Sequence, residues 1–471
     1  MIPLASVRGR WLVAVAVLGS GIAFLDGTVV TVALPAIGKD LATGLAGQQW
    51  VVDGYLLTLG ALLLAGGAAG DRYGRRRVFL TGLAAFAVAS AACALAPTGI
   101  VLIGARVVQG VAAAALIPGS LALINALIAE ADRARAIGLW AGMSGVTSAL
   151  GPFLGGYLVD AASWRWVFVI NVPLATVAIY LAVRHVPESR DAAAAGPFDI
   201  SGALLATAGL AGVVYALIEG PAHGWRPASV VCAIAGVLAL AGFLWREFRA
   251  PAALLPPKLF ASRQFSGANM TTFVVYAALG ASSFLLTLQL QQTLGYSALA
   301  AGAATVPITV VMLLGSPSAG VLAGRVGPRL PMTIGPIIAG AGLVMMALIV
   351  PGRAYVTAVL PAVMVFAIGL TITVTPLTAA VLAAVPQRHV GAASGVNNAI
   401  SRIGGLLAVA VLPAVAAITA APGEPLGPGF ARAMIICAAL CVAGGLISAL
   451  TIPGRPQPST RPPVPSHDPR T

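Results

Sequence analysis

Residues 67–77 read GAAGDRYGRRR, and this segment places one acid and four arginines in a chain of which only 9% is charged. Long apolar runs lie on both sides of it, each about 20 residues long, the length that a helix needs to cross a bilayer. A weaker copy, GVLAGRVGPRL, lies at 320–330. The repeated loop predicts two related halves, each built from membrane-spanning helices.

The composition supports the same interpretation, because 59% of the 471 residues are hydrophobic and the mean hydropathy is +0.96. Charged and Gly/Pro-rich segments divide the chain into fourteen apolar segments. This pattern predicts an all-α polytopic membrane protein with fourteen spans. The predicted spans are 11–35, 47–69, 78–97, 99–129, 136–160, 166–186, 200–220, 228–247, 268–291, 299–325, 331–351, 355–385, 394–420 and 431–453.

The basic residues predict the orientation of these spans. Most of the 27 Lys and Arg fall in loops on one side of the membrane. The exceptions on the other side are Lys39, Arg165, Arg226, Arg353 and Arg432. The positive-inside rule therefore predicts a multi-pass protein of the cell membrane with both termini cytoplasmic. This topology also accounts for the net charge of +13, so no nucleic-acid partner is expected.

Two longer inner connections, at 184–199 and 246–267, divide the spans into six, two and six. We therefore expect an N-terminal six-helix bundle (1–190), an inserted helix pair (191–250) and a C-terminal six-helix bundle (251–453). The segment 454–471 is rich in Pro, Ser and Arg, which predicts a disordered cytoplasmic tail.

Ionisable residues inside spans are costly and therefore mark function. At a rise of 1.5 Å per residue, Asp26 lies about 13 Å and Arg106 about 11 Å below the outer surface, so the two can meet. Asp53 is expected about 7 Å deep. Movement that separates a carboxylate from a guanidinium would switch the acid between binding and releasing a proton. The alternatives are a static salt bridge for the pair, and an interfacial residue contacting Gln48 or Trp50 for Asp53.

The second half contains no Asp or Glu between Glu247 and Glu424, so proton handling is expected in the first bundle. Its polar span residues could line a cavity or join helices by hydrogen bonds. They are Gln289, Gln291, Gln292, Thr371, Thr373, Thr375, Asn397, Asn398, Ser401 and Arg402. The four cysteines and four histidines show no metal-ligand spacing, so neither a metal nor another cofactor is expected.

Five segments carry a resemblance to the major facilitator superfamily, in its 14-span drug:proton antiporter branch. It includes antibiotic-resistance exporters of actinomycetes, such as the methylenomycin-resistance type. The segments are LDGTVVTVALP (25–35), GAAGDRYGRRR (67–77), LIGARVVQGVAAA (102–114), GPFLGG (151–156) and WRWVFVINVP (164–173). The resemblance implies two six-helix bundles with an inserted helix pair.

Carried over residue by residue, the resemblance implies three sets of functional residues. It assigns proton coupling to Asp26, Arg106 and the neighbouring Gln109, and our own interpretation of the residues adds Asp53. It assigns a cytoplasmic gate to Gly67, Asp71, Arg72, Gly74 and Arg75. It assigns a bend specific to exporters to Gly151, Pro152, Gly155 and Gly156. Because Gly324 stands where Asp71 stands in the first half, the gate is expected to be one-sided.

These observations predict a proton-coupled secondary antiporter that exports a lipophilic or amphipathic small molecule, such as a drug or an antibiotic. It is expected to be a monomer whose partners are the substrate, protons and the lipid bilayer. The lack of an acid in spans 9–13 argues against a dicationic substrate. A proton-coupled importer of a nutrient is the alternative, although GPFLGG is not expected in one. A membrane-embedded enzyme or sensor fits less well, because no loop is long enough for a soluble domain and no catalytic motif is found.

Overall fold

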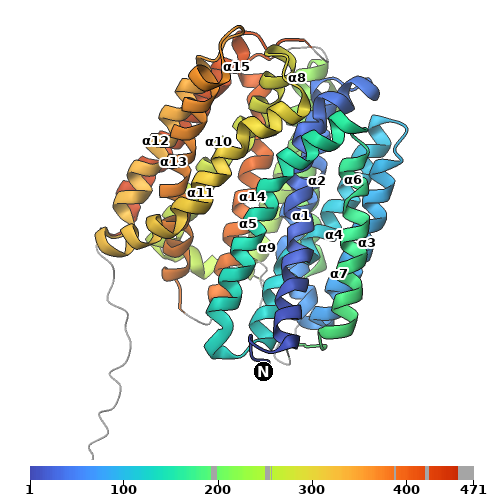
Figure 1. Cartoon of the computed structure of the whole chain (residues 1–471), viewed down its shortest axis with the longest axis vertical. Helices are drawn as coiled ribbons and strands as arrows, with labels where there is room; N and C mark the ends of the chain where they lie inside the picture. The colour runs from blue at the N-terminus through green and yellow to red at the C-terminus, as the bar shows by residue number, and fades with distance from the viewer. Residues whose placement is uncertain (192–198, 250–254, 256, 387–388, 419–423, 455–471) are drawn as a thin grey trace, which may run out of the picture.

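The computed structural model describes residues 1–191, 199–249, 255, 257–386, 389–418 and 424–454. Within these residues, fourteen helical segments are long and apolar enough to cross a membrane, which confirms the predicted span number. They stand roughly side by side (Figure 1). We call the end of the molecule that holds the N-terminus the lower end and the opposite end the upper end.

The first bundle contains six spans, the last of which is broken into two helices at Ile170. Its helices are α1 (Val7–Asp40), α2 (Leu45–Tyr73), α3 (Arg75–Ala94), α4 (Gly99–Leu127), α5 (Glu130–Ala161), α6 (Trp166–Val169) and α7 (Asn171–His185).

The second bundle also contains six spans, the first of which ends in a π-helical turn at its upper end. Its elements are η1 (Pro257–Ala261), α10 (Arg263–Leu288), η2 (Gln289–Thr293), α11 (Ala298–Val326), α12 (Arg329–Ala347), α13 (Tyr355–Ala383), α14 (Val390–Val415) and α15 (Pro428–Thr451).

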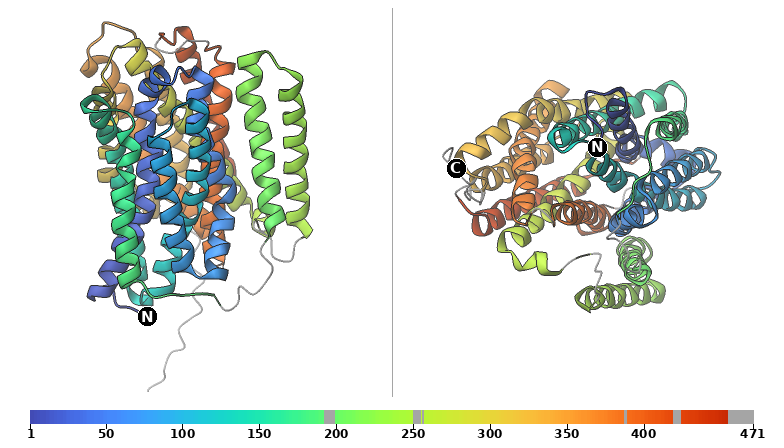
Figure 2. Two further views of the ribbon diagram at one scale, coloured as in Figure 1. Left: turned by 90° about the vertical axis from the view of Figure 1, so that its right-hand side faces the viewer. Right: turned by 90° about the horizontal axis from the view of Figure 1, so that it is seen from below.

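The inserted pair, α8 (Ile200–His223) and α9 (Pro227–Arg249), stands beside the two bundles as a separate hairpin (Figure 2). Asp199 caps α8 through a 2.8 Å bond from the backbone N–H of Gly202, and Arg246 of α9 donates to the same carboxylate at 2.7 Å. Partial burial opposes ionisation of Asp199, but these two bonds outweigh it and hold the pKa of the carboxyl below its ordinary value. The pair is therefore fastened at its lower end by a helix cap and an ion pair.

The six, two and six grouping is as predicted, whereas the residue boundaries of the three parts stay predictions. The boundary at 250/251 and most of the first connection fall on residues that the structure does not describe. The predicted disordered tail, 454–471, likewise lies outside the described residues except for Gly454.

Several helices extend beyond their predicted ends. Helix α1 continues through Pro35 to Asp40, so Asp26 lies about 21 Å from the upper end of its helix rather than about 13 Å from it. A proline within a membrane helix is tolerated because neighbouring helices satisfy the carbonyl it leaves free. Helix α2 begins at Leu45, so Asp53 is about 12 Å from the upper end and deeper than predicted.

The buried apolar residues form clusters that differ between the two ends of the molecule. One cluster joins both bundles near the upper end and includes Ile37 of α1 and Leu288 of α10. Below it, one cluster around Phe79 belongs to the first bundle. Another, around Phe265, belongs to the second bundle, and Leu64 of α2 is the one described residue of the first bundle that packs against it. A further cluster joins α2 and α14 through Leu57 and Leu406, so the bundles share apolar contacts at the upper end and also farther down.

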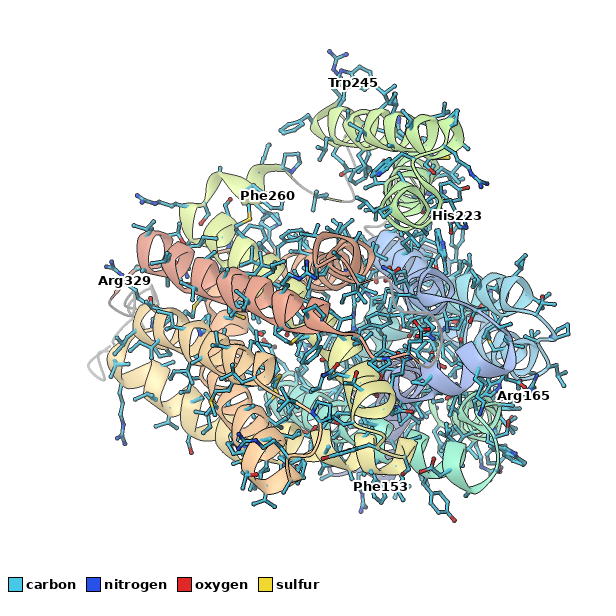
Figure 3. All side chains as sticks on the ribbon, turned by 90° about the horizontal axis from the view of Figure 1, so that it is seen from above. Phe153, Arg165, His223, Trp245, Phe260 and Arg329 are labelled. Carbon is cyan, nitrogen blue, oxygen red and sulfur yellow. The ribbon has the colours of Figure 1, made fainter. Side chains whose placement is uncertain are left out.

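Large apolar side chains also cover the circumference of the molecule. Phe153 is 47% exposed and Trp245 is 60% exposed, and both project outward in the view from above (Figure 3). So wide an apolar exterior is expected of a surface that faces lipid.

Candidate functional site

The predicted contact between Asp26 and Arg106 is present in the interior of the first bundle. Nη1 of Arg106 donates to Oδ2 of Asp26, and both side chains are at most 1% exposed. Oδ1 of Asp26 accepts from Nε2 of Gln109 at 2.9 Å and from Nδ2 of Asn171 at 2.9 Å. The carboxyl group is therefore surrounded by donors in this conformation, as a polar group buried in a membrane requires.

Arg106 is equally well satisfied. Its Nη1 donates to Oε1 of Gln109 at 2.6 Å and its Nε donates to the carbonyl of Val51 on α2 at 3.0 Å. The guanidinium also lies 4.3 Å from the ring centroid of Tyr55, whose hydroxyl donates to the carbonyl of Ala23. Cation–π contact of this kind stabilises a desolvated cation. The network thus joins α1, α2 and α4 around one ion pair.

Sequence reasoning missed two members of this network. Asn171, the first residue of α7, lies in the WRWVFVINVP segment but was assigned no role. Ser90 of α3 accepts from Gln109 at 2.7 Å and from Asn171 at 3.4 Å. A polar residue in an apolar span is the available signal, yet it does not indicate which partner the residue will meet.

Asp53 does not join this network, although its side chain is fully buried. Within the part of the chain that the structure describes, neither of its carboxylate oxygens has a hydrogen-bond partner. The proposed contacts with Gln48 and Trp50 at the interface are wrong, because the helix begins earlier than predicted and Trp50 donates to Glu219 instead. Asp53 is therefore a buried acid without a partner, which is rare in proteins.

Asp53 lies on the face of α2 that meets the second bundle. Gln49, one turn above it, donates to the carbonyl of Val409 on α14 at 2.7 Å. Two turns below Asp53, Gly60 faces Arg402 of α14, with 3.4 Å between the Cβ of Arg402 and the position a Cβ would take on Gly60. Residues spaced in this way share one side of a helix. The acid is thus positioned between the bundles.

The GDRYGRRR loop forms a tight turn at the lower end. Gly74 has φ +112°, a conformation that favours glycine, and a Cβ there would come within 2.9 Å of the Glu188 carboxylate. That carboxylate accepts from the backbone N–H groups of Arg76 and Arg77, which caps the start of α3. Asp71, assigned to the gate, accepts from Arg75 of the same turn at 2.7 Å, not from an arginine across the bundle.

The GPFLGG segment of α5 packs closely at the upper end. A Cβ on Gly151 would lie 2.0 Å from Oγ1 of Thr28 on α1, and a Cβ on Gly155 would lie 2.6 Å from Val29. Gly156 faces the second bundle, where a Cβ would lie 2.4 Å from the carbonyl of Ala298. Approaches this close leave no room for a Cβ, so these positions require glycine.

Helices α5 and α11 meet at their upper ends and diverge below (Figure 1). Asp160 of α5, which sequence reasoning missed, accepts from the backbone N–H groups of Ala298 and Leu299 and so caps α11. Lower down, Cβ atoms on Gly138 of α5 or Gly324 of α11 would meet nothing within 4 Å. The two bundles are thus joined above and separated below along this pair.

Substitution of Gly302 on α11 is expected to open the upper contact. A Cβ at Gly302 would lie 2.1 Å from the carbonyl oxygen of Pro152, and neither backbone can yield without separating the helices. Gly302→Ala should therefore disfavour the closed upper end by about 1–3 kcal/mol, which is roughly fivefold to more than a hundredfold in population.

Spin labels on cysteines introduced at Ala161 and Arg353, measured by double electron–electron resonance, should report a longer distance across the upper end in this variant. Gly138→Ala is the matched control, since its new methyl group meets nothing within 4 Å. An unchanged distance distribution in Gly302→Ala would show that this contact does not determine closure.

The polar residues of the second half do not converge on one site. Asn397 donates to Asn269 and Thr272 at 3.1 and 2.7 Å, so it joins α14 to α10. Thr371 and Thr373 donate to carbonyls of their own helix. Gln291 donates to the carbonyl of Val32 on α1 and so belongs to the upper contact.

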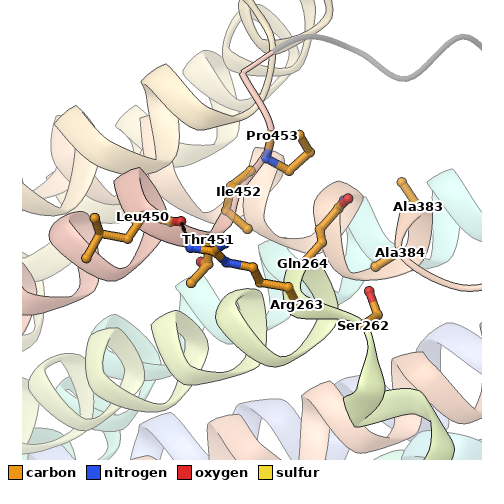
Figure 4. Close-up of a pocket in the computed structure, with 9 residues that line it drawn as sticks. All are labelled: Ser262, Arg263, Gln264, Ala383, Ala384, Leu450, Thr451, Ile452 and Pro453. Carbon is orange, nitrogen blue, oxygen red and sulfur yellow. Dashed lines mark hydrogen bonds between the residues drawn. The ribbon is translucent and has the colours of Figure 1, made fainter.

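A hollow of about 450 Å³ lies at the lower end of the second bundle, between the start of α10 and the ends of α13 and α15 (Figure 4). Arg263 spans it and donates to the carbonyl of Leu450 at 2.9 Å, which satisfies the end of α15. The hollow is remote from the Asp26 network, and we assign it no function.

Two bundles of six spans, with a buried ion pair inside one of them, define a secondary transporter. The family model described as Major Facilitator Superfamily matches residues 16–409. The chain belongs to this superfamily, which confirms the resemblance seen in the sequence motifs.

Its curated relatives are named for resistance or export. It is 39% identical to the "Methylenomycin A resistance protein" of Bacillus subtilis (strain 168), over 91% of this chain and 92% of that protein. It is 35% identical to the "Cephamycin export protein CmcT" of Amycolatopsis lactamdurans, over 90% of each chain. It is 34% identical to the "Tetracenomycin C resistance and export protein" of Streptomyces glaucescens, over 87% of this chain and 77% of that protein.

Solved structures agree in fold. An inward-facing, unoccupied bacterial homolog of the human lysosomal transporter Spinster superposes with a TM-score of 0.67 at 19% identity, covering 95% of this chain and 97% of that chain. A POT family transporter in complex with 5-aminolevulinic acid superposes with a TM-score of 0.70 at 13% identity, with the same coverage of both chains.

Proposed function

We propose that this protein is a proton-coupled antiporter of the cell membrane that exports a lipophilic or amphipathic small molecule. It acts as a monomer, with its lower end and both termini in the cytoplasm. The named activities of its relatives support export of an antibiotic or drug. The concentration of Lys and Arg in the lower loops supports the orientation.

The observation that carries proton coupling is Asp53. Among the described residues no group offers Asp53 a hydrogen bond or a counter-ion, and such burial strongly disfavours the charged form of a carboxyl group. Asp53 therefore holds a proton while the upper end is closed and no compound is bound. Because it lies on the face of α2 that meets α14, separation of the bundles at the upper end would expose it to water. Asp53 is thus placed to change protonation as the bundles move.

The Asp26 network acts as the support for this acid. Arg106 holds the carbonyl of Val51, two residues before Asp53, while Asp26 and Gln109 fix the guanidinium. A shift of α2 would break the bond from Arg106 to the Val51 carbonyl and so disturb the guanidinium that Asp26 and Gln109 hold. The pair of Asp26 and Arg106 thereby senses the same movement that exposes Asp53.

Alternating access follows from the unequal ends. The structure supports an inward-open state, in which the α5–α11 contact is closed and a compound enters from the cytoplasm. When the upper contact opens and the lower end closes, the compound leaves outside and Asp53 takes up a proton. After the return to the inward-open state, binding of the next compound releases that proton into the cytoplasm. The Gly67, Asp71, Arg72, Gly74 and Arg75 turn would then form the closed lower gate. Coupling requires only that proton and compound favour different states.

The test uses inside-out vesicles from cells that produce the protein. Methylenomycin A, tetracenomycin C and puromycin serve as probes, and vesicles from cells without the protein are the control. We expect a pH gradient, acid inside, to drive uptake of at least one probe, and nigericin to abolish it. Cells that produce the protein should also tolerate higher concentrations of that probe. Uptake that is indifferent to the gradient, or faster entry into intact cells, would contradict proton-driven export.

A further inference from the structure

Arg402 is an intramembrane cation for which the function proposed above has no use. It lies twelve residues above the start of α14 at Val390, about 18 Å into the span. Its side chain is only partly buried, in contrast to that of Arg106. A charged residue at this depth is expected to have a partner or to serve a ligand.

No carboxylate of the described residues pairs with Arg402. The second bundle cannot supply one from its spans, since the sequence from 248 to 423 contains neither Asp nor Glu. Asp53 lies on the facing helix, but it is about 10 Å above Gly60, the residue that Arg402 meets, and its oxygens have no partners. Nε of Arg402 likewise has no hydrogen-bond partner.

The surroundings of Arg402 belong to both bundles. Its guanidinium carbon lies 5.3 Å from the ring centroid of Phe24 on α1, and its Cβ meets α2 at Gly60. Phe24 belongs to the first bundle, so the cation reaches across the bundle interface. An aromatic ring and an unpaired guanidinium side by side match a compound that has an apolar ring system and an acidic group.

We infer that Arg402 binds the acidic group of the transported compound, so that the substrates are lipophilic anions. This inference rests on the proposed transport function. An anion bound there provides the counter-charge that no carboxylate of the described residues gives Arg402. It lies on the second-bundle side of the interface, whereas Asp53 lies on the first-bundle side. Neutral compounds of the same shape gain only the apolar contact.

The test compares two fluorescent probes that share one skeleton, anilinonaphthalene sulfonate and neutral phenylnaphthylamine. Saturable binding to the full chain in phosphatidylcholine nanodiscs is measured for the wild type, Arg402→Gln and Arg402→Lys. We expect Arg402→Gln to weaken sulfonate binding about tenfold or more, as loss of a charge-assisted bond implies, and to leave phenylnaphthylamine binding unchanged. Arg402→Lys should recover part of the loss. Arg325→Gln, at the lower end of α11, is the matched control.

The outcomes separate this inference from the proposed function. Equal sulfonate binding by wild type and Arg402→Gln overturns it, even where gradient-driven uptake in vesicles is intact. Loss of sulfonate binding in Arg402→Gln supports it, even where no antibiotic probe is transported. Should Arg402→Gln fail to fold, Arg402→Lys and the wild type decide, because a wild type that binds the sulfonate no more tightly than phenylnaphthylamine also overturns the inference.

Discussion

Asp53→Asn is expected to abolish proton-driven transport while the protein still folds and binds its substrate. Asparagine matches aspartic acid in size but cannot release a proton. The site offers no hydrogen bond to either side chain, so an amide and a neutral acid have similar desolvation costs there. The variant should therefore catalyse exchange of substrate down its own gradient but gain nothing from an imposed pH gradient.

Inside-out vesicles measure both activities, using whichever probe the wild type transports. Asp40→Asn is the matched control, since Asp40 is half exposed and pairs with Arg165 at the molecular surface. It should retain full gradient-driven uptake, whereas Asp53→Glu, which keeps an ionisable group, should retain part. Full gradient-driven uptake by Asp53→Asn would move the proton-carrying role to Asp26.

Much of the fold follows from the sequence, because membrane spans are determined by a local property, the length of an apolar run. The fourteen spans, the inserted pair and the family were all predicted. The sequence predicts the helix ends less accurately. Its pattern places the end of α1 at Pro35, but neighbouring helices allow the helix to continue to Asp40.

The sequence predicted contacts in the site only where the depth of two charged residues in the membrane was enough to bring them together. Asp26 and Arg106 are charged and lie at similar depths, so their contact followed from helix geometry alone. Ser90 and Asn171 carry no charge, and their roles depend on which face of each helix turns inward. The sequence pattern could not give those rotations, because the apolar residues lie all round most of these helices, as in a membrane bundle.

A double-mutant cycle on Asp26 and Arg106 is expected to give the largest effect on stability. Asp26→Asn leaves a guanidinium in a membrane interior without its counter-ion, and Arg106→Gln leaves the carboxylate without its cation. Either change should lower the free energy of unfolding by about 3–5 kcal/mol. The double variant removes both charges, so it should lose less than the sum of the two by about 2 kcal/mol or more.

Unfolding of the purified protein by SDS in mixed micelles gives these free energies. Asp40 and Arg165 supply a matched control pair at the surface, joined at 2.7 Å, for which the coupling should stay below about 1 kcal/mol because water screens it. Strictly additive losses at Asp26 and Arg106 would show that the other hydrogen bonds are enough to stabilise either charge alone. For Asp26 these come from Gln109 and Asn171, and Arg106 donates one to the Val51 carbonyl. A large coupling instead means that the two charges require each other, so a movement that separates them within the membrane interior would cost several kcal/mol, of the order of the loss from either single change.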